Sequence, residues 1–209
     1  DTYYAFAAAT NQFDTGLPLD EVVMEYITKE LKGVIGKQYA EPQGRILMNP
    51  FKDVKTSAWY GSYVIDLYND GIINGTSATT YAPNDTLTWA AALKLLLVSN
   101  GDLKAADATG ADWSKNTIAK AAELGLVAAD LDGAKAISRL EFCQVAAKLN
   151  KLAESKTESK FTDCTDGYVM ALVDAKVISG MTETTFEPAA SLTRAQIAKI
   201  LYQLNLIEK

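Results

Sequence analysis

The chain has 209 residues, of which 48% are hydrophobic and 22% charged, and this balance is ordinary for a globular protein of one or two domains. Its net charge of −6 argues against a nucleic-acid partner, because a phosphate backbone is bound by clustered Lys and Arg. The absence of histidine excludes a Ser-His-Asp triad, a Cys-His dyad and a His-ligated zinc ion. No apolar stretch approaches about 18 residues, so no membrane span is predicted.

The first part of the chain, residues 1–49, does not share the pattern of the rest and is predicted to be a helical N-terminal extension. An amphipathic helix is predicted over residues 19–31. Pro18 and Asp20 give it a start signal, and Gly33 follows it as an end signal.

The remainder repeats itself with a period of roughly 50 residues, which is typical of repeat architectures. We predict a first repeat over 50–101, a divergent second repeat over 102–150 and a third over 160–209, each a helix, a loop and a helix. In the alignment of the first and third repeats, Phe51 meets Phe161, Asp53 meets Asp163, Gly75 meets Gly180, Tyr81 meets Phe186, Pro83 meets Pro188 and Thr88 meets Thr193.

The second repeat keeps the first helix but lacks the Phe-x-Asp opening. Trp113 precedes Gly125 by the same spacing that separates Trp59 from Gly71. Both glycines stand where a helix commonly ends in a left-handed residue. Lys176 takes this place in the third repeat, so we expect that helix to end differently.

The second helix of each repeat begins with a capping signal. Ser138 with Glu141, and Thr193 with Gln196, match the capping box, in which a hydroxyl and a carboxylate or amide satisfy two free N–H groups. Thr88 keeps the cap residue without the reciprocal partner.

Arg139 and Arg194 follow these caps, although a cation at a helix start opposes the macrodipole at a cost of about 0.3–1 kcal/mol. Trp89 stands there in the first repeat. One hypothesis is an ion pair with Asp53 or Asp163. The other is an anion site, in which free N–H groups and the guanidinium receive a carboxylate or phosphate. The two can coexist.

These motifs resemble the S-layer homology domain. FKDV, GIING, YAP and LTWA carry the resemblance in the first repeat, FTDC, FEP and LTRAQ in the third, and the Trp113 helix with SRLEF in the second. The resemblance covers residues 50–209. It implies a mainly α fold, in which three helix-loop-helix repeats form a pseudo-threefold trimer around a central three-helix bundle.

The resemblance also implies a function and a location: non-covalent anchoring of a secreted protein at the bacterial cell wall or S-layer. The implied partner is an anionic cell-wall polysaccharide, such as one carrying a pyruvate ketal, held in grooves between repeats. Other surface-layer proteins are further candidate partners. No catalytic residue, metal or cofactor is implied. The candidate ligand-binding residues are Arg139, Arg194, Trp89, Asp53, Asp163, Trp59, Trp113, Gly75 and Gly180.

Departures from the family pattern predict unequal grooves. Trp89 removes one guanidinium or supplies an indole platform, and Trp59 and Trp113 either stack on sugars or pack in the core. We expect one or two working sites. Arg194, in the most complete repeat, is expected to matter more than Arg139.

A calcium loop is a competing hypothesis. Asp130, Asp132, Ser138 and Glu141 match EF-hand positions one, three, nine and twelve. Ala134 cannot ligate at the fifth position, and Lys135 replaces the turn glycine.

Three further alternatives stay open from the sequence. The repeats could be the anchor portion of a glycan-active enzyme, whose catalysis needs only two carboxylates. They could instead be a protein-binding module of a surface layer. Cys143 and Cys164 could form a disulfide or be two small buried side chains.

Overall fold

The computed structural model divides into two compact units, residues 1–46 and 47–209, and describes residues 47–207. The described residues form six helices and isolated β-bridges, so the predicted mainly α fold is confirmed. The helix predicted over residues 19–31 lies outside the described part. The helices are α3 (Gly61–Asn69), α4 (Trp89–Asn100), α5 (Trp113–Glu123), α6 (Arg139–Leu149), α7 (Gly167–Asp174) and α8 (Arg194–Asn205).

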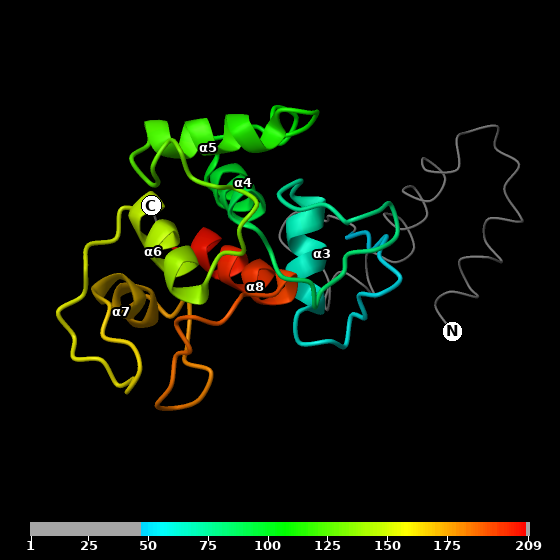
Figure 1. Cartoon of the computed structure of the whole chain (residues 1–209). Coiled ribbons are helices and arrows are strands. Elements are labelled where there is room, and N and C mark those ends of the chain that lie inside the picture. Colours follow the sequence, from blue (N-terminus) through cyan, green and yellow to red (C-terminus); the bar gives the residue numbers. More distant parts are fainter. Residues whose placement is uncertain (1–46, 208–209) are drawn as a thin grey trace, which may run out of the picture. The chain divides into compact units, whose positions relative to one another are not determined.

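The helices pack in an order that crosses the predicted repeats. The helix α4 packs against both α6 and α8, and Figure 1 shows α3, α5 and α7 on three different sides of this group. Each outer helix packs on an inner helix from a different repeat: α3 on α8, α5 on α4 and α7 on α6. Side chains such as Leu93, Phe142 and Ile197 are fully buried between them. No repeat therefore buries its apolar faces alone.

The predicted caps are present at the starts of the inner helices. Ser138 and Glu141 form a capping box on α6, and Thr193 and Gln196 form one on α8. The Thr88 hydroxyl accepts from the Ala91 N–H at 3.4 Å, without a reciprocal partner. These caps satisfy the third N–H of each inner helix.

The first two N–H groups of each inner helix bond to a loop from another repeat. The N–H of Trp89 donates to the Lys135 carbonyl at 2.9 Å, that of Arg139 to Ala190 at 2.8 Å, and that of Arg194 to Asp85 at 2.8 Å. The following N–H groups donate likewise: Ala90 to Gly133, Leu140 to Pro188 and Ala195 to Pro83. The exchange thus runs from the first predicted repeat to the second, then to the third and back to the first.

This exchange corrects the hypothesis of an anion site at the helix starts. That hypothesis required free backbone N–H groups, but the first three of α6 and of α8 are bonded to carbonyl or hydroxyl oxygens. Only the side chains of these helix starts remain available to a ligand. The pseudo-threefold arrangement and the repeat boundaries stay predictions, which the cyclic order of the bonds supports.

The ends of the outer helices confirm one expectation and correct another. Gly71 and Gly125 have φ of 72° and 70°, the left-handed conformation that glycine adopts without strain. Lys176 was expected to change the helix end, yet its φ is 60°. The lysine therefore follows the same path and tolerates a backbone strain of about 1 kcal/mol.

Replacement of Lys176 by glycine should stabilise the chain by about 0.5 kcal/mol, because the strain that it removes exceeds the backbone entropy that glycine adds to the unfolded state. Ala175→Gly is the matched control: its φ is −74°, so glycine there only adds backbone entropy to the unfolded state and should destabilise by roughly 0.5 kcal/mol. Urea unfolding of the full chain measures both changes. Equal signs for the two variants would contradict the strain at residue 176.

Candidate functional site

The two aspartates of the Phe-x-Asp motifs hold a strained turn. The Asp53 carboxylate accepts from the N–H groups of Tyr81 and Ala82 at 2.9 and 2.7 Å. Asp163 accepts from Phe186 and Glu187, both at 2.8 Å. Ala82 and Glu187 have φ of 58° and 61°, so each carboxylate stabilises a left-handed residue without glycine.

The second predicted repeat lacks both parts of this arrangement. It has no Phe-x-Asp opening, and its loop carries Asp132 at the position of Ala82 and Glu187. Asp132 is not among the residues with positive φ, and its own carboxylate accepts from the Ala134 N–H at 3.0 Å. The aspartate and the strained residue therefore occur together or not at all.

The interpretation of these aspartates as ion-pair partners is replaced by this backbone role. Arg194 is close enough to help lower the pKa of Asp53, but the carboxylate oxygens bond to backbone N–H groups. Burial raises the pKa of Asp53, and the bonds from Tyr81 and Ala82 outweigh it, so the net shift is downward. Bonds from Phe186 and Glu187 lower the pKa of Asp163.

Arg139 and Arg194 each reach into the loop of another predicted repeat and cover an aromatic ring. The Arg194 guanidinium lies 4.4 Å from the Tyr81 ring centre, and that of Arg139 lies 4.6 Å from Phe186. Such cation–π contacts contribute about 0.5–2 kcal/mol each. At the start of α4, the equivalent position is Trp89, which carries an indole instead of a cation.

The two guanidinium groups differ in how fully they are bonded. Arg194 donates from Nε to the Tyr81 carbonyl at 2.7 Å and from Nη2 to that of Asn74 at 2.8 Å. Arg139 donates from Nη2 to the Ser179 carbonyl at 2.7 Å, and its Nε is buried without a partner among the described residues. Arg139 is also only 6% exposed. It therefore retains a buried donor that Arg194 has already used.

Gly75 and Gly180 shape the loops that receive these arginines. A Cβ on Gly75 would lie 2.4 Å from the carbonyl oxygens of Ser77 and Thr80, and a Cβ on Gly180 would lie 2.3 Å from that of Thr182. Any side chain there would displace the loop. Their observed role is thus close packing of the backbone.

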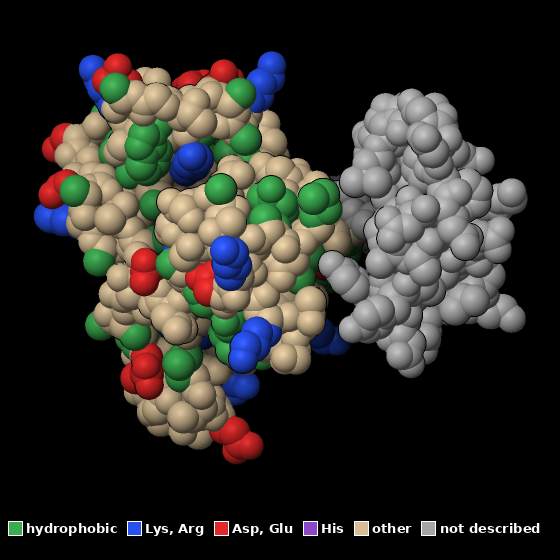
Figure 2. Space-filling view, turned by 90° about the vertical axis from the view of Figure 1, so that its right-hand side faces the viewer, with side chains coloured by type: hydrophobic (Ala, Val, Ile, Leu, Met, Phe, Trp, Pro, Cys, Tyr) green, Lys and Arg blue, Asp and Glu red, His purple; other side chains and the backbone are tan. Residues whose placement is uncertain are grey.

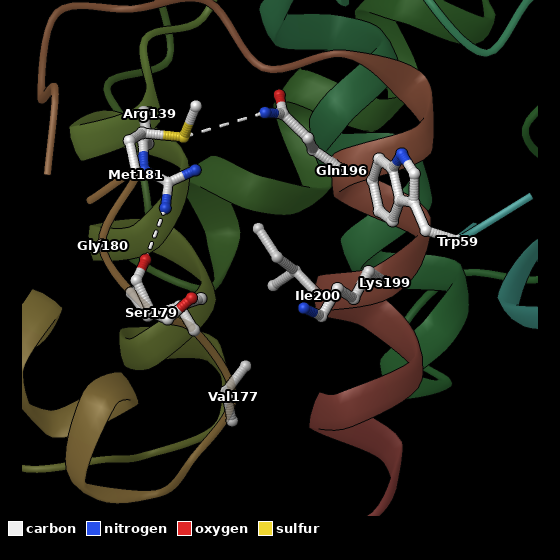
Figure 3. A pocket seen from close by; sticks show the side chains of 10 residues that line it. Trp59, Arg139, Val177, Ser179, Gly180, Met181, Gln196, Lys199 and Ile200 are labelled. Carbon is white, nitrogen blue, oxygen red and sulfur yellow. Dashed lines mark hydrogen bonds between the residues drawn. The ribbon is translucent and has the colours of Figure 1, made fainter. Parts of the chain in front are cut away.

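A pocket of about 170 Å³ brings together three of the predicted site residues: Trp59, Arg139 and Gly180 (Figure 3). Its other lining residues are Val177, Ile178, Ser179, Met181, Gln196, Lys199 and Ile200. Trp59 is 58% exposed, so its ring is a surface feature of the pocket and not core packing. The remaining predicted residues lie elsewhere: Arg194, Trp89, Asp53, Asp163, Trp113 and Gly75.

The pocket combines positive charge with an apolar wall. The Lys199 side chain is exposed at its edge, and Arg139 supplies a second cation, while Ile200 and Val177 are apolar. On the face shown in Figure 2, by contrast, acidic and basic side chains are interspersed. The pocket can therefore offer local attraction to an anion on a chain whose net charge is −6.

Gln196, Lys199 and Ile200 were missed by the sequence analysis. Their spacing on α8 places them on one helix face, which is the signal that could have found them. The sequence does not reveal that residues 177–181 lie opposite this helix face, because the two segments meet only after folding.

Trp113 occupies a different environment from Trp59. It is half-buried, and the Lys94 ammonium lies 5.3 Å from its ring centre. Burial lowers the pKa of Lys94. The indole face of Trp113 is thus partly covered by the chain's own cation.

The calcium hypothesis finds no support in the geometry. Glu141 uses its carboxylate to accept from the Ser138 N–H at 2.8 Å and hydroxyl at 2.6 Å. Within residues 47–207, no three acidic, Cys or His side chains gather as metal ligands.

Cys143 and Cys164 are free and buried, and burial raises the pKa of Cys143 to about 12. They are buried thiols in this structure and not a disulfide.

Comparison with known proteins identifies the class of module. Residues 50–93 and 162–198 match the family model of the S-layer homology domain. Domains of this family are non-catalytic anchors that attach proteins to the cell wall by binding its polysaccharide, which gives this chain a cell-surface location. No helix in the described part is long and apolar enough to cross a membrane.

The relatives are larger surface proteins and enzymes. The chain is similar to an endoglucanase of Bacillus sp. (strain KSM-635), with 29% identity over 74% of this chain and 18% of that protein. It is 40% identical to a surface-layer 125 kDa protein of Lysinibacillus sphaericus over 37% of this chain and 7% of that protein. An amylopullulanase of Thermoanaerobacterium thermosulfurigenes is 26% identical over 76% of this chain and 10% of its own length. The chain thus spans less than a fifth of each of these relatives.

Acid should weaken the fold by protonating Asp53 and Asp163, whose carboxylates hold the two strained turns. A depressed folded-state pKa gives stability that is present above the unfolded value of about 3.9 and is lost as the pH falls through the folded value. Asp163→Asn should therefore lower stability near neutral pH and flatten the loss of stability below about pH 4. Unfolding by urea at pH 7 down to pH 3 measures this, with Asp53→Asn as the equivalent change. If the free energy of unfolding fell with pH in parallel for wild type and both variants, this role of the two aspartates would be contradicted.

Proposed function

We propose that the chain holds a larger protein on the bacterial cell wall by binding an anionic polysaccharide in the pocket formed by Trp59, Arg139 and Lys199. The observation that carries this proposal is the Arg139 guanidinium at the wall of a surface pocket that the exposed Trp59 and Lys199 also line (Figure 3).

The exposed indole supports a sugar as the ligand. Trp59 offers an apolar ring at the opening of the pocket, and an aromatic ring can pack against the C–H face of a pyranose. The two cations favour an acidic substituent over a neutral one. The ligand class that combines these features is an anionic saccharide, including one with a pyruvate ketal.

We propose the opposite order for the two arginines from the one expected from the sequence. Arg194 was expected to matter more, but it lies outside the pocket and has two backbone carbonyls as partners. Arg139 lines the pocket and has one backbone carbonyl as a partner. In this proposal Asp163 and Gly180 act indirectly, because they shape the loop whose Ser179 carbonyl accepts from Arg139.

The remaining candidate binding residues lie at the equivalent positions of the other repeats. Trp113 and Arg194 correspond to Trp59 and Arg139 in the predicted repeat order, with Asp53 and Gly75 shaping the loop. Lys94 over the Trp113 ring competes with a sugar for that face. We therefore propose a weaker second groove there, and Trp89 leaves the third without a guanidinium.

A second proposal concerns what the chain is attached to. Three relatives are named as an endoglucanase, an amylopullulanase and an exoglucanase, and this chain matches 10% to 18% of the length of each. These proportions support the chain as the anchor portion of a glycan-active enzyme. The surface-layer relative supports a structural cargo, in which neighbouring surface-layer proteins would be further partners.

Binding of the full chain to cell-wall sacculi should fall by about tenfold or more in Arg139→Ala and in Trp59→Ala, because each removes a central contact. Arg194→Ala is the matched control and should lose less. Cosedimentation with sacculi gives the affinities. Arg139→Lys separates folding from binding, since it keeps the charge but loses the planar fork.

Melting temperatures must accompany these affinities. A folded Arg139→Lys variant with weakened binding supports the pocket. Unchanged binding by folded Arg139→Lys and Trp59→Ala, or a larger loss in Arg194→Ala, would overturn it.

A further inference from the structure

The amide of Gln196 is held in one orientation by the cap of its own helix. The Thr193 N–H donates to Oε1 of Gln196 at 2.9 Å, while the Thr193 hydroxyl accepts from the Gln196 N–H at 3.3 Å. With Oε1 fixed toward the cap, Nε2 points across the pocket (Figure 3). The capping box therefore presents an N–H donor to the pocket interior.

This donor has only a weak partner. Nε2 of Gln196 lies 4.0 Å from the sulfur of Met181, and a thioether is a poor hydrogen-bond acceptor. Met181 is itself 46% exposed, and its side chain is unbranched and flexible. A ligand oxygen could displace the sulfur at little cost and make a stronger bond.

The other capping box shows what a carboxylate does at this position. Glu141 in α6 corresponds to Gln196, and its Oε2 accepts from both the N–H and the hydroxyl of Ser138. A glutamate at position 196 would keep the cap, but it would place an acceptor and a negative charge where Gln196 places a donor. It would also compensate Arg139 and Lys199, which line the same pocket.

We propose that Gln196 is a specificity-determining residue that selects a carboxylate on the bound saccharide. The carboxylate replaces the Met181 sulfur as partner of Nε2 and lies beside the Lys199 ammonium, three residues further along the same helix face. This inference rests on the proposed function of the pocket. It assigns the discrimination between acidic and neutral ligands to the amide of Gln196.

Calorimetric titration of the full chain tests the inference with two acidic probes, each paired with its methyl ester. One is a methyl hexosaminide carrying a 4,6-pyruvate ketal, and the other is methyl glucuronide, so that the two sources of a carboxylate are distinguished. Wild type should bind at least one acid about tenfold more tightly than its ester. Gln196→Glu should lose about tenfold for that acid and little for the ester, because like charges then face each other.

Glu141→Gln is the matched control, since it makes the reverse exchange in the other capping box, away from the pocket. It should leave the preference for the acid unchanged. Gln196→Glu should remain folded, because a glutamate already forms this cap in α6.

The failures of the two proposals are distinguishable. Gln196→Glu with wild-type affinity for the acid, while Arg139→Lys is weakened, overturns the role of Gln196 and leaves the pocket in place. The role of Gln196 is also overturned, and the pocket is left in place, if wild type binds sacculi but does not prefer either acid to its ester. Wild type that binds neither sacculi nor any probe overturns both.

Discussion

The donation of two backbone N–H groups from each inner helix start to a loop elsewhere in the chain is the constraint on which this structure depends. The bonds connect α4 to the loop at Lys135, α6 to the loop at Ala190 and α8 to the loop at Asp85. Unpaired N–H groups at a buried helix start would be costly, so these loops must lie where they do. The side chain that follows each cap is thereby brought against a distant loop.

The pocket is a consequence of that exchange. The bonds of α6 to residues 188 and 190 carry Arg139 onto the Phe186 ring and toward the Ser179 carbonyl. The packing of α3 on α8 brings the start of α3 next to the face that carries Lys199. Three segments that are far apart in the sequence therefore meet at one surface. None of them would form a binding site alone.

Local chemistry made much of the fold predictable, and long-range packing limited the prediction of the site. Caps and left-handed glycines were found because they depend on residues only a few positions apart. Lys176 was misjudged because it adopts the left-handed conformation that its local preference opposes. The two arginines look alike in sequence, and only the folded loops show that Arg139 lines the pocket while Arg194 donates to the Tyr81 and Asn74 carbonyls outside it. Gln196 was read as a cap, and its second role depends on the distant Met181.

In the proposed function, one pocket beside Trp59 and Arg139 receives an anionic sugar. A crystal structure of the full chain soaked with a pyruvylated saccharide tests it most directly. We expect a sugar ring against Trp59, with its carboxylate near Arg139, Gln196 and Lys199. A saccharide bound instead beside Arg194 and Trp113, with this pocket empty, would contradict it.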